Sequence, residues 1–270
     1  MKNSNYNILP PLKWAGGKRW LVNEHLNLFP KNFNRYIEPF FGSGAVFFKL
    51  QPPKATLSDL NSELIETYKS IKSDWRKVFQ ALKTHQRLHT KDYYYKVRAQ
   101  KLKAPYSKAA RFIYLNRTCW NGLYRVNLQG NFNVPIGTKT KVILDSDDFE
   151  GVAKLLKNSR LLAEDFKTII EQAKKGDFLF VDPPYTGMHN QNNFIKYNEK
   201  LFSLDDQIHL NDSLVKAKKR GVKILLTNAC HPFVKKLYKD HFEMIRVSRK
   251  SVIAANPKNR TPIEEFVITT

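Results

Sequence analysis

The sequence predicts an α/β protein whose mostly parallel sheet is interrupted by a helical insertion. Short apolar runs alternate with longer amphipathic stretches at both ends of the 270-residue chain, as strands do with crossover helices. A glycine-containing turn follows the run at residues 35–38, which is how many βαβ units begin. In the middle of the chain, helical stretches at residues 74–88, 91–100 and 108–116 follow one another with no strand between them.

An excess of basic residues points to a polyanionic partner. The chain carries 46 Lys and Arg against 24 Asp and Glu, a net charge of +22. Residues 71–144 hold 16 of these basic residues, and the acids among them are Asp74 and Asp92. A generally basic composition does not explain this concentration, which is typical of a nucleic-acid-binding surface. The middle segment is therefore predicted to contact a polyanion.

Composition disfavours several other classes of protein. No apolar run is long enough to span a membrane, and the start of the chain leads into no signal-peptide segment, so a cytoplasmic protein is expected. Cys119 and Cys230 are the only cysteines, and no histidines cluster near them. Two isolated thiols make neither a zinc site nor a disulfide framework, so no metal is expected.

The rest of the chain is organised around Asp182-Pro183-Pro184-Tyr185, which follows the apolar run 177–181. Proline lacks an N–H group and fixes its φ angle, so the chain must leave the sheet there as a rigid turn. The turn offers a carboxylate and two carbonyls at the carboxyl edge of the sheet, where open α/β folds bind ligands. These acceptors can hold both hydrogens of an exocyclic amino group while the tyrosine stacks on the attached base. A strand end with a packed Tyr185 is the alternative.

The tetrapeptide resembles the catalytic motif of the S-adenosylmethionine-dependent amino methyltransferases, which modify adenine N6 or cytosine N4. The resemblance implies that Asp182, Pro183, Pro184 and Tyr185 are catalytic and that Asp182 also borders the cofactor. Methyl transfer from a sulfonium is an in-line displacement that needs positioning of the amine rather than a covalent nucleophile. The chain shows no placed Cys or Ser nucleophile, in agreement with this chemistry.

The turn after the first predicted strand fits this cofactor better than it fits a dinucleotide. Gly42 and Gly44 allow a ligand to approach the backbone closely. The third glycine of a dinucleotide fingerprint is missing, and Phe47 stands where a small residue would be needed. The loop matches the Phe-x-Gly-x-Gly pattern of the methyltransferases. The resemblance implies that the cofactor contacts Glu38, Phe40, Gly42 and Gly44.

Asp59 ends the second predicted strand, at residues 55–59. An acid at this place can accept hydrogen bonds from both ribose hydroxyls of a nucleotide cofactor. The alternative role is to cap the helix that follows at residues 61–71, and the two roles can coexist.

Two further cofactor segments rest on resemblance. The segment Lys13-Trp14-Ala15-Gly16-Gly17-Lys18 is similar to the motif that opens the Dam-type adenine methyltransferases. The resemblance implies that Trp14 and Lys18 contact the cofactor and that Lys13 faces DNA. It also implies that Asp165 and Phe166, at the end of a strand predicted over residues 161–166, contact the adenine of the cofactor. A helix N-cap is the alternative for Asp165.

The stretch at residues 116–137 closely resembles the target-recognition hairpin of the Dam family, with its turn predicted at Gln129-Gly130. The resemblance implies two groups of DNA-contacting residues. The first group wedges into the duplex near a flipped base, and the second group contacts the DNA around that base. The first group is Trp120 and Asn121, and the second is Leu123, Arg125, Asn127 and Pro135. A packed hairpin without DNA contact is the alternative. The chain departs from the family at Thr138-Lys139, where an arginine usually follows Pro-x-Gly.

On these motifs the chain is identified as a member of the Dam-type DNA adenine-N6 methyltransferases (D12 class, alpha group). The resemblance implies a Rossmann-like sheet with a terminal antiparallel strand, a monomer, and methylation of a flipped adenine in duplex DNA, within GATC. It divides the chain into catalytic segments 1–72 and 146–270 and a target-recognition domain 73–145. The alternatives are another GAT-containing site, an RNA amino methyltransferase, and a non-catalytic DNA-binding regulator. The polar loop at residues 186–198 is expected to close over the substrates.

Overall fold

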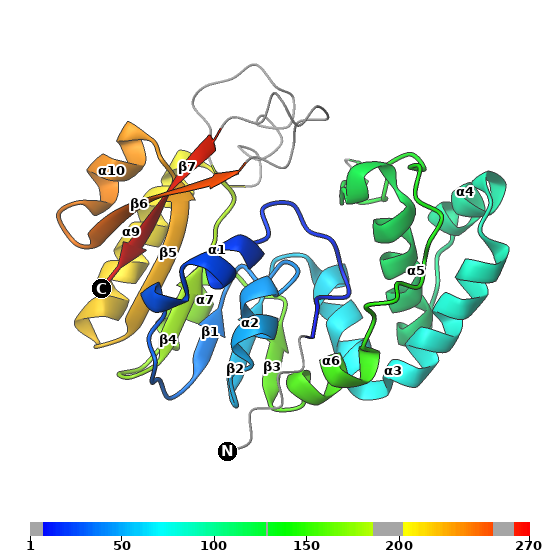
Figure 1. Cartoon of the computed structure of the whole chain (residues 1–270), viewed down its shortest axis with the longest axis horizontal. Coiled ribbons are helices and arrows are strands. Elements are labelled where there is room, and N and C mark those ends of the chain that lie inside the picture. Colours follow the sequence, from blue (N-terminus) through cyan, green and yellow to red (C-terminus); the bar gives the residue numbers. More distant parts are fainter. Residues whose placement is uncertain (1–7, 128, 186–201, 251–261) are drawn as a thin grey trace. The chain divides into compact units, whose positions relative to one another are not determined.

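The computed structural model describes residues 8–127, 129–185, 202–250 and 262–270, and the predicted loop at residues 186–198 lies outside them. The described strands form a seven-stranded sheet in the order β3-β2-β1-β4-β5-β7-β6 (Figure 1). Their bounds are β1 Tyr36–Glu38, β2 Ala55–Ser58, β3 Ser159–Leu162, β4 Phe178–Val181, β5 Lys223–Ala229, β6 Glu243–Lys250 and β7 Pro262–Thr269.

The pairing of the strands confirms the predicted α/β class. Strand β1 runs parallel to β2 and β4, and β4 runs parallel to β5. Strand β7 lies between β5 and β6 and runs antiparallel to both. The three-residue β1 and the four-residue β2 and β4 are buried at every position, as expected for inner strands of a parallel sheet.

Helices separate the strands along the chain from β1 to β6. They are α1 Arg19–Glu24, α2 Ala45–Leu50, α3 Ser62–Leu88, α4 Lys91–Ala99, α5 Pro105–Thr118, α6 Phe149–Leu156, α7 Phe166–Glu171, α9 Leu204–Lys219 and α10 Pro232–Tyr238, with 3-10 turns η1 Leu26–Leu28 and η2 Trp120–Gly122. None of the helices in the described parts of the chain combines the length and apolar character needed to cross a membrane.

The chain forms two compact units, each made of three separate segments. The helical unit comprises Met1–Val22, Phe41–Pro53 and Asp59–Ala163, and the sheet unit comprises Asn23–Phe40, Lys54–Ser58 and Glu164–Thr270. The domain boundaries expected from the sequence stay a prediction.

In the helical unit, α3 joins two stretches that the sequence predicts as separate helices. The backbone leaves helical geometry at Asp74, with φ −154° and ψ 75°. The Asp74 side chain accepts a hydrogen bond from Lys77 N at 3.2 Å, so it caps the second half of α3. The sequence therefore indicates a real local helix start, which lies at a kink within one long helix.

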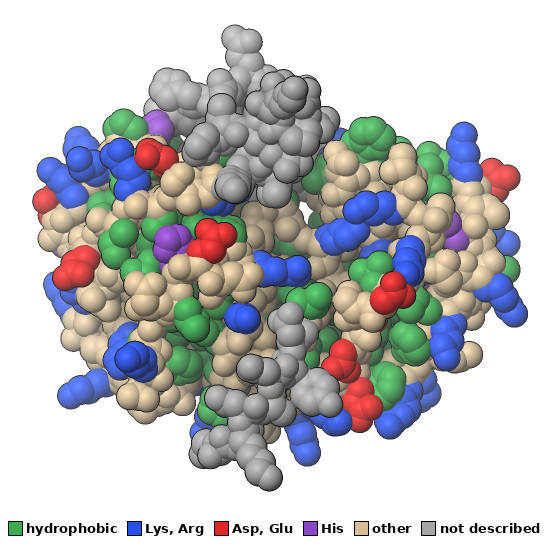
Figure 2. All heavy atoms as spheres, viewed as in Figure 1, with side chains coloured by type: hydrophobic (Ala, Val, Ile, Leu, Met, Phe, Trp, Pro, Cys, Tyr) green, Lys and Arg blue, Asp and Glu red, His purple; other side chains and the backbone are tan. Residues whose placement is uncertain are grey.

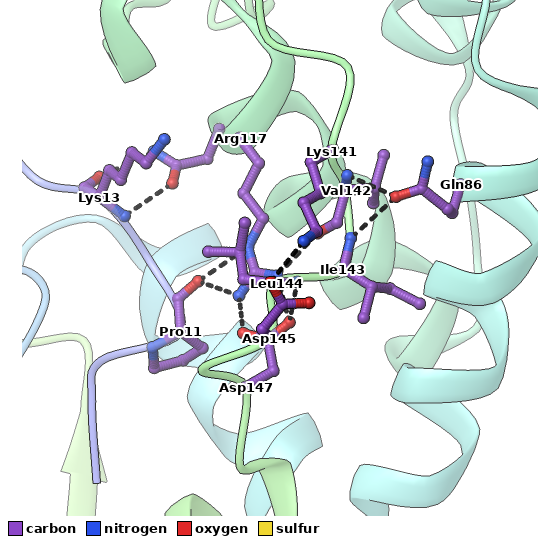
Figure 3. A network of polar contacts seen from close by, with 11 residues as sticks. Pro11, Lys13, Gln86, Arg117, Lys141, Val142, Ile143, Leu144, Asp145 and Asp147 are labelled. Carbon is purple, nitrogen blue, oxygen red and sulfur yellow. Dashed lines mark hydrogen bonds and ion pairs between the residues drawn. The ribbon is translucent and has the colours of Figure 1, made fainter. Parts of the chain in front are cut away.

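A buried arginine on α5 is the centre of a network of polar contacts inside the helical unit (Figure 3). Arg117 is 1% exposed, and its guanidinium meets both carboxylate oxygens of Asp147 at 2.6 and 2.7 Å. It also donates to the carbonyl of Pro11 at 3.1 and 2.7 Å and to that of Val142 at 2.7 Å. One side chain thus connects the N-terminal segment, α5 and the loop after residue 137.

The neighbouring residue, Asn116, holds the backbone of Lys13. Its Oδ1 accepts from Lys13 N at 2.9 Å, and its Nδ2 donates to Lys13 O at 2.8 Å and to Gly122 O at 3.3 Å. The segment that precedes Trp14 is therefore fixed against the start of the predicted recognition hairpin.

Candidate active site

The glycine-containing loop lies in the helical unit and requires glycine at two positions. Gly42 and Gly44 have φ angles of +49° and +67°, a region that L side chains rarely adopt. A Cβ atom at Gly42 would lie 2.7 Å from Trp14 Cδ1, and one at Gly44 would collide with Phe41. The loop is therefore packed directly against the predicted cofactor residue Trp14.

Asp59 holds this loop in place. Its carboxylate accepts hydrogen bonds from Gly42 N and Asn61 N, both at 2.9 Å. Helix α3 is capped by Asn61, whose side chain accepts from Leu64 N, and not by Asp59. Burial raises the pKa of the Asp59 carboxyl group, and the two backbone N–H donors oppose that rise. Each carboxylate oxygen keeps a second lone pair, so the group fits a ligand with ribose hydroxyls.

We expect Asp59→Ala to weaken binding of S-adenosylmethionine by roughly 10- to 100-fold. The substitution removes a charge-assisted acceptor, worth about 1.5–3 kcal/mol, and also releases Gly42 N. Calorimetric titration of the purified variant measures the affinity.

Asn61→Ala is the matched control for this prediction. It removes the α3 cap, at a cost of about 1 kcal/mol of stability, and leaves the acceptor on the loop intact. Equal affinities for the cofactor in wild type and Asp59→Ala, with only a lower melting temperature in the variant, would contradict the binding role.

Trp14 and Lys18 belong to the same unit as the glycine loop. The Trp14 ring stacks on Tyr124 with a centroid distance of 5.7 Å and on Phe112 at 6.5 Å. The Lys18 ammonium group donates to Gly16 O at 2.8 Å, and the residue is 4% exposed. Both predicted cofactor residues therefore have fixed positions.

In the sheet unit, the Asp182–Tyr185 turn follows β4 at the carboxyl edge of the sheet, as predicted. Thr227 on β5 donates to Asp182 Oδ1 at 2.7 Å, and Thr227 is fully buried. The Tyr185 hydroxyl donates to Glu265 Oε2 on β7 at 2.7 Å. The acid and the ring of the motif are thus each held by a side chain from another strand.

Glu38 ends β1 at the same edge. Its carboxylate accepts from the Tyr36 hydroxyl at 2.8 Å, and Glu38 is 3% exposed. Burial raises the pKa of Tyr36 well above its usual range, and the carboxylates of Glu38 and Asp182 raise it further. Tyr36 therefore stays a neutral hydrogen-bond donor to Glu38.

Three aromatic rings cluster beside these residues. Phe40 stacks on Phe166 at a centroid distance of 5.5 Å, and Phe202 contacts both rings at 5.6 Å. Strand β3 ends at Leu162, earlier than predicted, because Asp165 is the N-cap of α7 and accepts from Lys167 N at 2.9 Å. The N-cap alternative for Asp165 is therefore present, and its predicted role toward the cofactor stays a prediction.

The predicted DNA-contacting residues are gathered around a hairpin in the helical unit. Bridges join Val126 to Phe132 and Cys119 to Ile136, and Gly130 has a φ of +77° at the turn. Trp120 is 52% exposed, and Asn121 is exposed with an unusual φ of +54°. A large ring and a strained polar residue therefore project where the wedge is predicted.

Other hairpin residues have partners of their own. Arg125 Nε donates to Asn133 Oδ1 at 2.9 Å, which aligns the exposed guanidinium along the hairpin. Asn127 Oδ1 accepts from the backbone N–H groups of Gln129 and Asn131 and so supports the turn. Leu123 is half-buried and Pro135 is exposed.

Two lysines, Lys13 and Lys139, lie close together beside this hairpin. Burial and the neighbouring Lys139 ammonium group lower the pKa of Lys13 to about 8. On the face drawn in Figure 2, Lys and Arg side chains are more widespread than Asp and Glu. Among the residues that the structure describes, no cluster of three His, Cys, Asp or Glu side chains could hold a metal ion.

Four residues that hold the predicted site residues or their segments in place are absent from the predictions: Asn116, Arg117, Thr227 and Glu265. Asn116 and Arg117 lie in the stretch that resembles the recognition hairpin, and Thr227 lies in an apolar run that carries no sign of a contact with Asp182. Glu265 did carry a signal, because two adjacent acids in a strand must point to opposite faces and one of them must face inward.

The mostly parallel sheet, the glycine loop after β1 and the Asp-Pro-Pro-Tyr turn after β4 define an S-adenosylmethionine-dependent methyltransferase. More specifically, the chain belongs to the D12 class N6 adenine-specific DNA methyltransferase family, whose family model matches residues 14–253. It is therefore an adenine-specific DNA methyltransferase that takes its methyl group from S-adenosylmethionine.

Full-length relatives agree with this assignment. The chain is 35% identical to the Type II methyltransferase M1.LlaDCHI of Lactococcus lactis subsp. cremoris, over 100% of this chain and 98% of that protein. It is 36% identical to the Type II methyltransferase M.MjaIII of Methanocaldococcus jannaschii, over 97% and 98%. It is 33% identical to the DNA adenine methylase of Haemophilus influenzae, over 96% and 92%.

Proposed function

We propose that this enzyme methylates N6 of an adenine that is flipped out of duplex DNA, within the sequence GATC. The observation that carries the proposal is the turn at Asp182–Tyr185. Its carboxylate is fixed by Thr227 and its phenol ring by Glu265, so a flat base with an exocyclic amino group finds a rigid acceptor beside a rigid ring. The GATC assignment is supported by the similarity of residues 116–137 to the Dam-type hairpin.

The proposed chemistry uses few protein groups. Adenine N6 is a weak nucleophile because its lone pair is delocalised into the ring. Acceptance of its two hydrogens by Asp182 and the Pro183 carbonyl lets the nitrogen become pyramidal, and the carboxylate stabilises the positive charge that develops there. Bound S-adenosylmethionine supplies an activated methyl group on a sulfonium. The amine proton then passes to water, so no strong base is needed.

The target base must be flipped out, because the enzyme cannot reach N6 while the base is stacked inside a duplex. Extrusion of a base costs a few kcal/mol, and stacking on Tyr185 returns roughly 1–3 kcal/mol. The exposed Trp120 ring, with Asn121 beside it, is suited to fill the gap left in the stack.

We assign the remaining residues as the sequence predicts. The cofactor is held by Trp14, Lys18, Glu38, Phe40, Gly42, Gly44, Asp59, Asp165, Phe166 and Asp182. DNA is contacted by Lys13, Trp120, Asn121, Leu123, Arg125, Asn127 and Pro135. Residues 73–145 act as the target-recognition domain between two catalytic segments, and the protein acts as a monomer.

The proposal is tested by sequencing plasmid DNA methylated in vitro, with a readout that reports N6-methyladenine at each position. We expect modification at the adenine of GATC. A broader GAT-containing site is the second candidate, since the exposed Thr138 stands where the family usually carries an arginine. Methylation at sites that lack GAT would overturn both.

Arg125→Ala is expected to reduce methylation of the cognate duplex by roughly 10- to 100-fold. The guanidinium group of Arg125 can recognise a guanine through two hydrogen bonds, which are worth about 1–3 kcal/mol of discrimination between bases. The rate should fall much less on a duplex in which that guanine is already replaced. A phosphate contact would weaken both duplexes about equally, so an equal loss would show that Arg125 only positions the DNA backbone.

A further inference from the structure

We propose that Glu265, held by Arg249, is a positioning residue that fixes the plane in which Tyr185 stacks on the target base. This inference rests on the proposed function, and it assigns a task to two residues of the terminal antiparallel strands. Neither residue belongs to the Asp-Pro-Pro-Tyr motif or to the predicted cofactor and DNA contacts.

Glu265 lies inside the sheet and not on its surface. It is 1% exposed and sits on β7, opposite Ala229 of β5 on one side and Val247 of β6 on the other. Its Oε2 accepts from the Tyr185 hydroxyl at 2.7 Å, and its Oε1 accepts from Arg249 Nε at 2.6 Å. The two oxygens of one buried carboxylate thus serve two different partners.

Arg249 makes this arrangement stable. Burial of an unpaired carboxylate is expensive, and such a group usually takes up a proton instead. Arg249 lies on β6, two residues beyond Val247, which is the residue opposite Glu265. Its guanidinium compensates the charge of Glu265. The Arg249 guanidinium and the Tyr185 hydroxyl thus donate to different oxygens of the same buried carboxylate.

The contact fixes Tyr185 at its far end. The Cα end of the side chain follows the rigid Pro183-Pro184 turn, and the hydroxyl at the opposite end is bound to Glu265. Both side-chain torsions are then set before any base arrives. Burial and the nearby Asp182 and Glu265 carboxylates raise the pKa of Tyr185 well above its usual range, so the phenol keeps its proton and remains a donor. A preset plane helps catalysis because small misplacements of a reacting group are costly.

Glu264, the neighbouring acid, differs from Glu265 in its surroundings. Glu264 points to the other face of β7, where its side chain is 50% exposed and meets Arg246 at a long 3.6 Å. An exposed pair of this kind contributes little to stability. Glu264→Gln is therefore a matched control on the same strand, with the same change in charge.

The test is a double-mutant cycle on methylation kinetics. We expect Glu265→Ala to lower kcat by roughly 10- to 100-fold with little change in the Kd for duplex DNA, and Glu265→Gln to retain more activity because its amide oxygen still accepts. Tyr185→Phe removes the hydroxyl and should cause a similar loss. Because Glu265 acts through that hydroxyl, Glu265→Ala should add little in the Tyr185→Phe background. Full additivity of the two losses would overturn the proposal.

A spectroscopic readout separates positioning from general damage to the sheet. With 2-aminopurine at the target adenine, the fluorescence of the bound duplex reports stacking of the flipped base. Glu265→Ala should shift this signal toward that of Tyr185→Ala, while Glu264→Gln should match wild type. A lowered melting temperature with wild-type fluorescence and kcat would show that Glu265 is only structural. Failure of the proposed function would appear differently, as a wild-type product other than N6-methyladenine in GATC.

Discussion

Asp182→Ala is expected to reduce methyl transfer below detection while duplex DNA binding remains close to that of wild type. The carboxylate is the only charged acceptor in the motif, and in the proposed mechanism it acts on the amine in the transition state. Loss of a single group that stabilises developing charge already reduces kcat by about 10²–10³-fold, and here alignment of the amine is lost as well. Incorporation of labelled methyl groups and a gel-shift titration measure the two properties.

The fold should tolerate this substitution. When the carboxylate is removed, the Thr227 hydroxyl keeps the Val181 carbonyl within reach at 3.4 Å, so no buried donor is stranded. Asp212→Ala, at an exposed position of α9, is the matched control and should retain full activity. Turnover at the wild-type rate in Asp182→Ala would remove the proposed catalytic role.

Asp147→Ala is expected to destabilise the protein by about 3–5 kcal/mol, since it leaves the buried guanidinium of Arg117 without its counter-charge. For a chain of this size, such a loss lowers the melting temperature by roughly 6–20 °C. The Leu144 N–H group, which donates to Asp147 Oδ2 at 2.9 Å, also loses its acceptor. Thermal unfolding followed by circular dichroism gives the shift.

Asp145→Ala provides the comparison for this experiment. Asp145 lies two residues earlier in the same loop, pairs with Lys141 at 2.6 Å, and is 92% exposed. An exposed pair of this kind contributes about 0–1 kcal/mol, so its removal should barely move the melting temperature. Equal shifts in the two variants would mean that the Arg117 network does not stabilise the helical unit.

Local chemistry made much of the fold predictable. The starts of α9 and α10 carry local signals, because Ser203 and Asp206 form a capping box at the start of α9 and Pro232 opens α10. The β4 end was equally clear, since two prolines cannot continue a strand. In each case the signal lies within a few residues of the feature that it determines.

The residues that support the site were not predictable in this way. Thr227 meets Asp182 across 45 positions and Glu265 meets Tyr185 across 80, and neither separation leaves a local pattern. The strand predicted at residues 161–166 ends early because Asp165 is the N-cap of helix α7, in addition to its predicted role toward the cofactor. Pairings between distant strands decide these positions, and one sequence does not reveal them.

The position of β7 within the sheet has a consequence for the order in which the sheet is completed. Strand β7 is the last of the described strands along the chain, yet it does not lie at an edge of the sheet but enters between β5 and β6. Until it arrives, β6 has no neighbour on that side and Tyr185 lacks Glu265. A nascent chain that stops before Pro262 therefore carries the whole Asp-Pro-Pro-Tyr motif in an unfinished sheet. Under the role proposed for Glu265, such a chain would methylate DNA more slowly than the chain that includes β7.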